Sequence, residues 1–438
     1  MSHTTYALID CNNFYVSCER VFNPALRKLP VAVLSNNDGC IIARSDEVKD
    51  LGIPMGAPYF KYKKQLEENN CVVLSSNYTL YGDMSSRVMN CLSEFSSQIE
   101  YYSIDEAFIE LSHIKQEDLT EYGQEIKDYI YKATGIPVSL GIAPTKTLAK
   151  MANILAKKEF RTSKREYRAS KLNSVFSLIG LNDQELAYCL EKTKIEDVWG
   201  IGRKYSKMLQ ANQVDDALAF TKLPESFVQA KMSVTGLKTL RELKGNSCLE
   251  LDTITENKKS IISSSSFGQP IENLEDLKPA VATFCTRIGE KLRKQGSKAT
   301  YLSVFITTSR FKSKEELYYQ ACLSVPLPEE SNYTPQLITT AFSLLEKIYK
   351  EGYQFKKAGV MVSSLSQGVQ ENLLREESEV VNEKKEKAMK VIDKLNSKLG
   401  RYTIKQASLN TKVKWQPIAN LRSPRYTTEP MEMMRVKL

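Results

Sequence analysis

The chain has 438 residues, of which 42% are hydrophobic, enough for several buried cores and roughly three or four domains. Its 61 lysines and arginines against 52 aspartates and glutamates give a formal net charge of +9, which is compatible with a polyanionic partner but does not establish one. The nine cysteines lack CxxC spacing, which argues against a zinc ribbon or a disulfide framework, and His3 and His113 are too few for histidine or zinc catalysis to be expected. No secretion signal or long apolar run is recognisable, so a cytoplasmic location without membrane insertion is expected.

The first part of the chain, residues 1 to about 165, mixes strand and helix patterns and predicts an α/β core. A short buried strand, Tyr6–Ile9, delivers Asp10 to its end. Between residues 24 and 80 the chain is richer in Gly, Pro and Asn, which indicates a small inserted subdomain. The other predicted elements are strands at Val31–Leu34, Val72–Leu74 and Val138–Ile142 and a helix from Thr145 to Lys158.

Two adjacent carboxylates, Asp105 and Glu106, lie inside the strand-forming segment Tyr101–Ile109. Together with Asp10 from another strand of the same sheet, they could hold a divalent cation. Because Mg²⁺ is usually bound by one or two carboxylates and substrate phosphates, this arrangement suits phosphoryl transfer. The alternative is an ordinary hairpin turn, where Asp and Glu are common.

Residues 166 to 245 are predominantly helical and contain Val198–Lys204, which is typical of a helix-hairpin-helix. Gly200 and Gly202 allow a tight turn whose N–H groups can bind a DNA phosphate without reading sequence, and Arg203 and Lys204 favour that function. The alternative is an ordinary helix connection. Val234–Lys238 resembles a degenerate second copy of the motif.

Residues 258 to 365 show the order βαββαβ, which predicts a ferredoxin-like domain. Its first helix is expected to stop at Gly296 and its second to run from Thr334 to Gly352. A basic loop containing Arg310 and Lys312 follows the second strand. One face of the sheet is expected to be polar, and it could follow a nucleic-acid backbone or simply be solvated.

Beyond residue 366 the sequence predicts a flexible tether, an isolated helix over Asn382–Leu399, and a basic final segment. The final segment, residues 401 to 438, contains Trp415 and is expected to dock on the protein or to be partly disordered. The surface around Trp415 and Arg422–Tyr426 is a candidate docking surface for a partner.

Four motifs, in chain order, resemble those of Y-family translesion DNA polymerases: Asp10–Tyr15, Tyr102–Phe108, Gly141–Lys150 and Val198–Arg203. Within that family the chain is similar to the UmuC-type branch, which supplies the catalytic subunit of bacterial DNA polymerase V. The resemblance covers essentially the whole chain and implies a multidomain α/β and α+β right-hand fold. The implied domains are a palm at residues 1–25 and 80–165, fingers at 26–79, a helical thumb at 166–245, a linker at 246–257, a ferredoxin-like little finger at 258–365, and a C-terminal tail at 366–438.

The resemblance also implies how the acids act. Asp10 and Asp105 would bridge two Mg²⁺ ions, Glu106 would complete the shell of the primer-side ion, and the main-chain carbonyl of Cys11 would contribute. The substrates would be dNTPs and primer-template DNA. The rival functions for such a site are a metal-dependent nuclease or nucleotidyl cyclase, and a noncatalytic DNA-binding scaffold.

The nucleotide site is predicted from the same resemblance. Tyr15 stands where the family places a steric gate against ribonucleotides, although it could instead be a core tyrosine. Lys49 and Lys157 are the implied triphosphate contacts, whereas Asp46 departs from a tyrosine found in many relatives. The spacing of Lys146, Lys150 and Lys157 places all three on one helix face, a cationic stripe that suits phosphate. From spacing alone, a solvated face is the alternative for each of these lysines.

The remaining implied contacts are with partners. Gln370, Leu373 and Leu374 resemble a sliding-clamp-binding peptide, for which a plain tether is the alternative. The resemblance further implies a UmuD-type accessory dimer, a RecA filament and a role in SOS-type mutagenic DNA repair.

Overall fold

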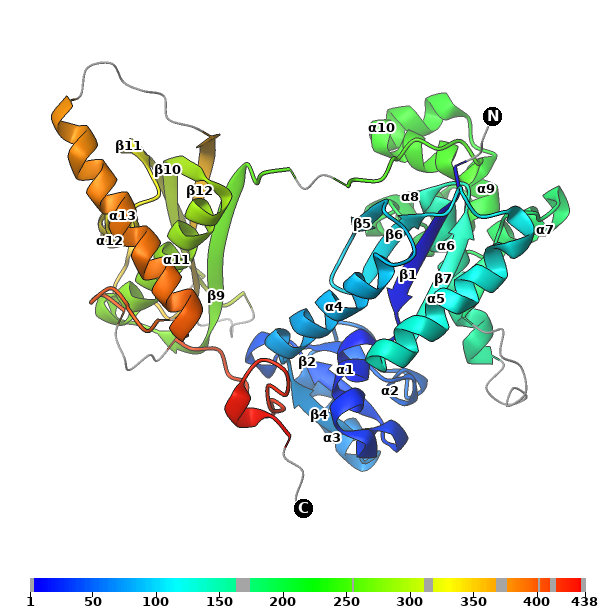
Figure 1. Cartoon of the computed structure of the whole chain (residues 1–438), viewed down its shortest axis with the longest axis horizontal. Coiled ribbons are helices and arrows are strands. Elements are labelled where there is room, and N and C mark those ends of the chain that lie inside the picture. The colour runs from blue at the N-terminus through cyan, green and yellow to red at the C-terminus, as the bar shows by residue number, and fades with distance from the viewer. Residues whose placement is uncertain are drawn as a thin grey trace. The chain divides into compact units, whose positions relative to one another are not determined.

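The computed structural model describes residues 4–162, 174–253, 256–310, 318–367, 376–400, 402–409 and 415–434. These residues form two compact units, coloured along the chain in Figure 1. The first comprises residues 1–35, 40–255 and 421–438, and the second comprises residues 36–39 and 256–420. No helix among the described residues is long and apolar enough to cross a membrane.

The first unit is built around a five-stranded sheet of order β5-β6-β1-β7-β8, in which β1 pairs antiparallel with both β6 and β7. The strands are β5 (Ile99–Tyr101), β6 (Glu106–Glu110), β1 (Tyr6–Cys11), β7 (Val138–Ala143) and β8 (Val175–Ser177). Side chains alternate across β1, so that Ala7 and Ile9 join one core while Tyr6 and Leu8 join another. Buried on both faces, this strand is a rigid base for Asp10.

Helices cover both faces of this sheet (Figure 1). On the face of Ala7 and Ile9 lie α1 (Phe14–Phe22), α4 (Tyr78–Leu92) and α5 (Leu119–Thr134). On the face of Leu8 lies α6 (Lys146–Thr162), which packs on β1 and β7. It approaches β7 so closely that a Cβ atom on Gly141 would stand 2.2 Å from the carbonyl oxygen of Ala149, and glycine is therefore required there.

A second, three-stranded sheet of order β3-β2-β4 occupies the region predicted as an inserted subdomain. It has a core cluster of its own, to which Leu34, Val48 and Leu66 belong. The elements of this region are β2 (Val31–Leu34), β3 (Ile41–Arg44), α2 (Asp46–Asp50), α3 (Tyr59–Glu68) and β4 (Val72–Ser75).

The helical region packs against the α6 side of the larger sheet through a shared core. Its helices are α7 (Asp183–Glu191), α8 (Arg203–Ala211), α9 (Ala217–Thr221) and α10 (Glu225–Leu243). The backbone of α10 breaks at Ser233, which has φ 62°. Two helical stretches of α10 meet at this break, and Val234–Lys238, interpreted from sequence as a degenerate second copy of the motif, follows it directly. That interpretation stays a prediction.

The second unit has the predicted order βαββαβ, in an antiparallel sheet of order β11-β10-β12-β9. Its strands are β9 (Ser260–Ile271), β10 (Ser297–Thr308), β11 (Gln320–Ser331) and β12 (Phe355–Gln367). The helices α11 (Leu274–Gln295) and α12 (Thr334–Ile348) share its core. As predicted, α11 ends at Gly296, which has φ 72°, but α12 ends at Ile348 and not at Gly352. The prediction that one sheet face is polar is only partly met: Gln320 and Ser324 of β11 are exposed, but so are Ile262 of β9 and Tyr301 of β10.

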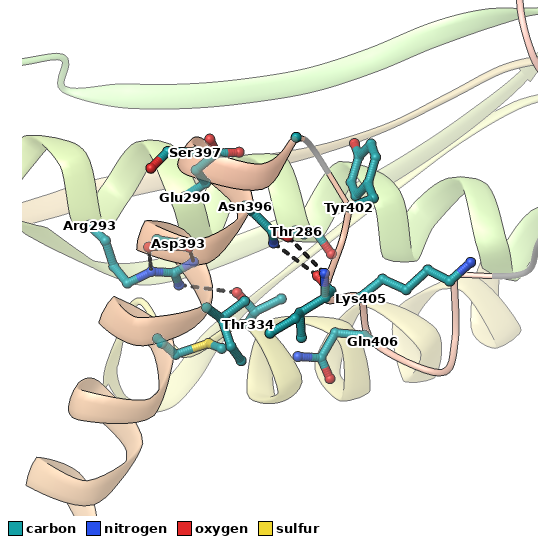
Figure 2. A pocket seen from close by; sticks show the side chains of 14 residues that line it. Thr286, Glu290, Arg293, Thr334, Asp393, Asn396, Ser397, Tyr402, Lys405 and Gln406 are labelled. Carbon is teal, nitrogen blue, oxygen red and sulfur yellow. Dashed lines mark hydrogen bonds and ion pairs between the residues drawn. The ribbon is translucent and has the colours of Figure 1, made fainter.

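The helix predicted as isolated, α13 (Glu376–Leu399), is attached to the second unit. Figure 2 shows Arg293 of α11 facing Asp393 of α13, and both guanidinium contacts are short, at 2.6 and 2.9 Å. A second ion pair joins Lys298 to Glu386 at 3.1 Å. A cavity of about 300 Å³ remains between α11, α13 and the loop after Tyr402. The predicted isolation of this helix was therefore wrong, because its acids meet basic partners far away in the sequence.

Candidate active site

The three predicted carboxylates lie at the same end of two neighbouring strands of the larger sheet, β1 and β6. Strand pairing places Asp10 directly opposite Glu106, and the N–H of Cys11 donates to the carbonyl oxygen of Asp105 at 2.9 Å. Because residues opposed in an antiparallel pair project from the same face, the side chains of Asp10 and Glu106 share the face that α6 covers. Asp10 and Glu106 are about 95 residues apart in the sequence, and the pairing register of β1 and β6 places them opposite each other.

The turn between β5 and β6 is organised by Ser103. Its hydroxyl donates to Oδ1 of Asp105 at 2.6 Å and accepts the backbone N–H groups of Asp105 and Glu106 at 3.3 and 3.0 Å. The segment is therefore a hairpin turn, as one alternative predicted, and the same turn presents two carboxylates beside Asp10. The turn and the carboxylate site are compatible.

Lysines of α6 face these acids. Lys157 Nζ lies 2.6 Å from Oδ2 of Asp10, and Lys150 Nζ lies 3.2 Å from Oε1 of Glu106. The third lysine of the predicted stripe, Lys146, is only 4% exposed and pairs with buried Glu100. The stripe as a whole was therefore a wrong prediction for phosphate binding, since Lys146 is used in packing and only the other two border the carboxylates.

The electrostatics of the site favour an added cation. The pKa of Asp10 is raised from 3.8 to about 6, chiefly by burial; Lys157 opposes this change, and the neighbouring charges of Glu106 and Asp105 add to it. Negative charge is thus not fully compensated by the lysine. Carboxylate oxygens in such a setting fit a hard divalent cation.

That site is not preassembled. Among the residues that the structure describes, no three His, Cys, Asp or Glu side chains converge as a ready metal-binding group. Asp10 and Glu106 are instead held by Lys157 and Lys150, so a cation competes with two ammonium groups for its ligands.

Cys11 can contribute only through its main chain. Its side chain is 2% exposed and packs in the core on the face opposite Asp10. Burial raises the pKa of this thiol well above its usual value, so a thiolate ligand is disfavoured. The geometry is consistent with the predicted role of its carbonyl.

Lys49, predicted to contact a triphosphate, lies in a polar group at the start of α1. Its Nζ donates to Oδ1 of Asn13 and lies 3.2 Å from Oδ1 of Asp46, and Nδ2 of Asn13 donates to the same Asp46 oxygen at 3.2 Å. Asp46 therefore positions both neighbours. Sequence reasoning missed Asn13, although its place next to the Asp10 motif was a usable signal.

Tyr15, the predicted steric gate, is half-buried on α1. Its ring stacks on that of Tyr81, with centroids 4.3 Å apart and an interplanar angle of 15°, and meets Tyr78 edge-on at 6.1 Å. Packing of this kind fixes the ring direction while leaving part of it accessible. The core and gate alternatives thus both find support in its surroundings.

The predicted DNA-binding turn precedes α8. Gly200 has φ 90°, and a Cβ atom there would stand 2.6 Å from Oγ1 of Thr239, so only glycine fits. Gly202, Arg203 and Lys204 are exposed at the N-terminus of α8, where free N–H groups attract anions. Arg310, in the second unit, is also exposed. Lys312, Gln370, Leu373 and Leu374 lie outside the described residues.

A link between this turn and the carboxylates was not predicted. Nε1 of Trp199 donates to the hydroxyl of Tyr102 at 3.0 Å, and Nζ of Lys150 lies 4.3 Å from the centre of the Tyr102 ring. Both aromatic residues stand inside motifs already recognised, which was the available signal. They connect the helix-hairpin-helix turn to the hairpin that carries Glu106.

Comparison with known proteins shows the family of the chain. Residues 9–153 match the impB/mucB/samB family, residues 258–373 match the C-terminal domain of that family, and residues 386–436 match a domain of unknown function. The chain is 40% identical to the protein UmuC of Salmonella typhimurium, over 99% of this chain and all of that protein. It is 29% identical to a DNA polymerase IV of Saccharolobus solfataricus, over 67% of this chain and 80% of that one.

The fold has a counterpart among solved structures. A Y-family DNA polymerase chimera matches with a TM-score of 0.65 and 18% identity, covering 83% of this chain and all of the other. At that identity the likeness concerns the fold alone. It accords with the two units described above and with the predicted right-hand architecture.

Proposed function

Because the chain belongs to the impB/mucB/samB family and is a UmuC-type, Y-family translesion DNA polymerase, we propose that it extends primers past damaged bases by two-metal-ion nucleotidyl transfer in SOS-type mutagenic repair. The observation that carries the mechanism is the pairing of Asp10 with Glu106 across β1 and β6, with Asp105 in the adjoining turn. A nuclease or cyclase could share these acids. The turn at Gly200 and the half-buried Tyr15 favour a polymerase over both.

The family implies a divalent cation as cofactor, and we propose two Mg²⁺ ions, which Asp10, Asp105, Glu106 and the carbonyl of Cys11 would hold. Bound there, they would lower the pKa of the primer 3′-hydroxyl and stabilise charge on the leaving pyrophosphate. Asp105, in the turn between β5 and β6, is assigned to both ions. Glu106, at the start of β6, is assigned to the primer-side ion.

Lys157 and Lys49 bind the triphosphate of the incoming dNTP in this proposal. Each lysine now pairs with an aspartate, Lys157 with Asp10 and Lys49 with Asp46. A triphosphate offers more negative charge than one carboxylate, so each ammonium group can transfer its hydrogen bonds from protein to substrate. Tyr15 excludes a ribose 2′-hydroxyl by occupying its space.

DNA is held by contacts that do not read sequence. The N-terminus of α8, with Gly200, Gly202, Arg203 and Lys204, binds backbone phosphates of the duplex. Arg310 and Lys312 add cationic contacts from the second unit. The domain limits deduced from sequence, with the palm at residues 1–25 and 80–165, are part of this proposal.

The proposed partners are a sliding clamp, a UmuD-type dimer and a RecA filament, in the cytoplasm. The clamp would bind Gln370, Leu373 and Leu374. The surface Arg422–Tyr426, predicted as a partner site, is engaged within the protein itself: Arg425 pairs with Glu432 and Tyr426 stacks on Phe22. Arg422 and Pro424 in the same stretch are exposed, so the partner site stays a prediction.

Primer extension tests the proposal. Native protein with Mg²⁺ and dNTPs is expected to lengthen a primer, and Asp105→Ala to abolish the reaction. A nuclease would instead shorten the primer, and a scaffold would bind it unchanged. Either result under conditions in which a reference polymerase works would contradict the proposal.

A further inference from the structure

The C-terminal segment Leu421–Met434 packs on the first unit, beside α1 and α4. It begins by continuing the smaller sheet: Ser75, the last residue of β4, donates its N–H to the carbonyl of Leu421 at 3.1 Å and accepts the Leu421 N–H on its hydroxyl at 3.0 Å. A parallel bridge joins Ser75 to Arg422. Backbone pairing thus fixes where the segment enters.

Asn77 holds the next residues. Its side chain is almost fully buried, and Nδ2 donates to the carbonyl of Ser423 at 3.1 Å, to the Ser423 hydroxyl at 2.9 Å and to the carbonyl of Pro424 at 3.0 Å. Asn77 is also the N-cap of α4. The segment and the start of α4 therefore share one buried side chain.

The hydroxyl of Ser423 reaches a buried carboxylate. Glu19 of α1 is 1% exposed, and its Oε1 accepts hydrogen bonds from Ser423 at 2.9 Å and from the Tyr81 hydroxyl at 2.7 Å. Burial raises the pKa of Glu19, and these two donors oppose that change. A buried carboxylate depends strongly on its donors, so Ser423 and Tyr81 are coupled through it.

Tyr81 in turn supports Tyr15. The Tyr81 ring is fully buried and stacks face to face on the Tyr15 ring. Tyr15, Glu19 and Phe22 follow the spacing i, i+4, i+7 and therefore lie on the same face of α1. Phe22 stacks on Tyr426, with ring centroids 5.0 Å apart. One helix face therefore has the nucleotide-site ring at one end and the C-terminal segment along the remainder.

We propose that the C-terminal segment is a positioning element of the nucleotide site, in which Ser423 acts through Glu19 and Tyr81 to hold the ring of Tyr15. This inference rests on the proposed function, since Tyr15 must be the gate for its position to affect sugar choice. Ser423, Glu19 and Tyr81 are positioning residues and touch no reacting atom. The segment belongs to the matched domain of unknown function, to which this assigns a role.

The segment is itself held in shape by Arg425. Its side chain contacts Glu432, its backbone N–H donates to Oε2 of Glu432 at 2.6 Å, and Glu429 lies 3.5 Å from the same guanidinium. The guanidinium and the N–H lower the pKa of Glu432 to about 2. After Ser423, the segment is therefore held in a folded conformation by contacts between its own residues.

The test measures kcat/KM for a dNTP and for the matching rNTP in single-nucleotide primer extension. Ser423→Ala is expected to lower the dNTP preference by about three- to tenfold, because one of two hydrogen bonds to a buried carboxylate is lost and part of that loss reaches the ring. Tyr81→Phe should act in the same direction. Ser423→Thr retains the hydroxyl and should keep the native ratio.

The matched control is Thr428→Ala, which removes one exposed hydroxyl from the same segment and should leave the ratio unchanged. A loss of folded enzyme would lower both rates equally and leave their ratio intact, so a change of ratio separates positioning from stability. In a Tyr15→Ala background, Ser423→Ala should have no further effect on the ratio.

Three results would overturn the inference: a native ratio in Ser423→Ala, equal losses in Ser423→Ala and Ser423→Thr, or an undiminished effect of Ser423→Ala in the Tyr15→Ala background. Failure of the proposed function is recognised separately. In that case the native protein itself would not extend the primer with dNTPs.

Discussion

Replacement of Asp10 by asparagine is expected to stabilise the cation-free protein while abolishing synthesis. The carboxylate of Asp10 is mostly buried, with 15% of its side chain exposed, and it lies beside Glu106 and Asp105. Lys157 compensates its charge only in part, so its pKa is raised from 3.8 to about 6. Asparagine has nearly the same shape and carries no charge. The substitution therefore removes the cost of an ionised group and leaves the packing in place.

The magnitude follows from linkage between protonation and folding. Between pH 3.8 and about 6 the folded protein retains a proton at Asp10 that the unfolded chain releases, so stability falls as pH rises through this window and stays reduced above it. At about 1.4 kcal/mol per pH unit, Asp10→Asn is expected to gain up to about 3 kcal/mol at pH 7. The gain should shrink to about 1 kcal/mol at pH 4.5.

The assay is guanidinium denaturation in EDTA, followed by tryptophan fluorescence. The chain has two tryptophans, and in a Trp415→Phe background only Trp199 of the first unit reports. Both Asp10 and Asp10→Asn proteins carry this background change, so it cancels. A loss of stability at pH 7, or a gain that does not vary with pH, would refute the reasoning.

Three further changes have expected outcomes. Lys146→Met removes the ion-pair partner of buried Glu100 and should lower the free energy of unfolding, measured by denaturation, by about 3–5 kcal/mol. The double variant with Glu100→Gln should lose much less stability. Additive losses would argue against a buried ion pair. Gly200→Ala should weaken DNA binding, measured by fluorescence anisotropy, because alanine is strained at a φ of 90° and its Cβ would meet Thr239 of the neighbouring helix. The milder control is Gly202→Ala, since a Cβ atom at exposed Gly202 meets nothing within 4 Å. Deletion of residues 370–374 should reduce processivity with a clamp and spare distributive synthesis; equal loss in both assays would speak against a clamp peptide.

Much of the fold was predictable because local periodicity carries it. The βαββαβ order of the second unit was visible in apolar spacing and in Gly296, and the strand before Asp10 was visible as a short apolar run. The register was not visible. That Asp10 lies opposite Glu106 depends on hydrogen bonds between strands about 95 residues apart in the chain.

The sequence also could not show which residue each polar side chain contacts. The spacing of Lys146 and Lys157 correctly placed them on one helix face, yet spacing cannot tell that one is buried against Glu100 and the other borders Asp10. The contact between Ser423 and Glu19 spans 404 residues and has no local pattern at all. Such long-range polar contacts are decided by tertiary packing.

The most direct test of the central claim is primer extension across a damaged template base, with Mg²⁺, dNTPs, a UmuD-type dimer and a RecA filament supplied. Native protein is expected to extend the primer past the lesion, Asp105→Ala to give no product, and Glu106→Ala to retain a small residual rate. Extension by Asp105→Ala at the native rate, or none by the native protein where a reference translesion polymerase succeeds, would contradict the account.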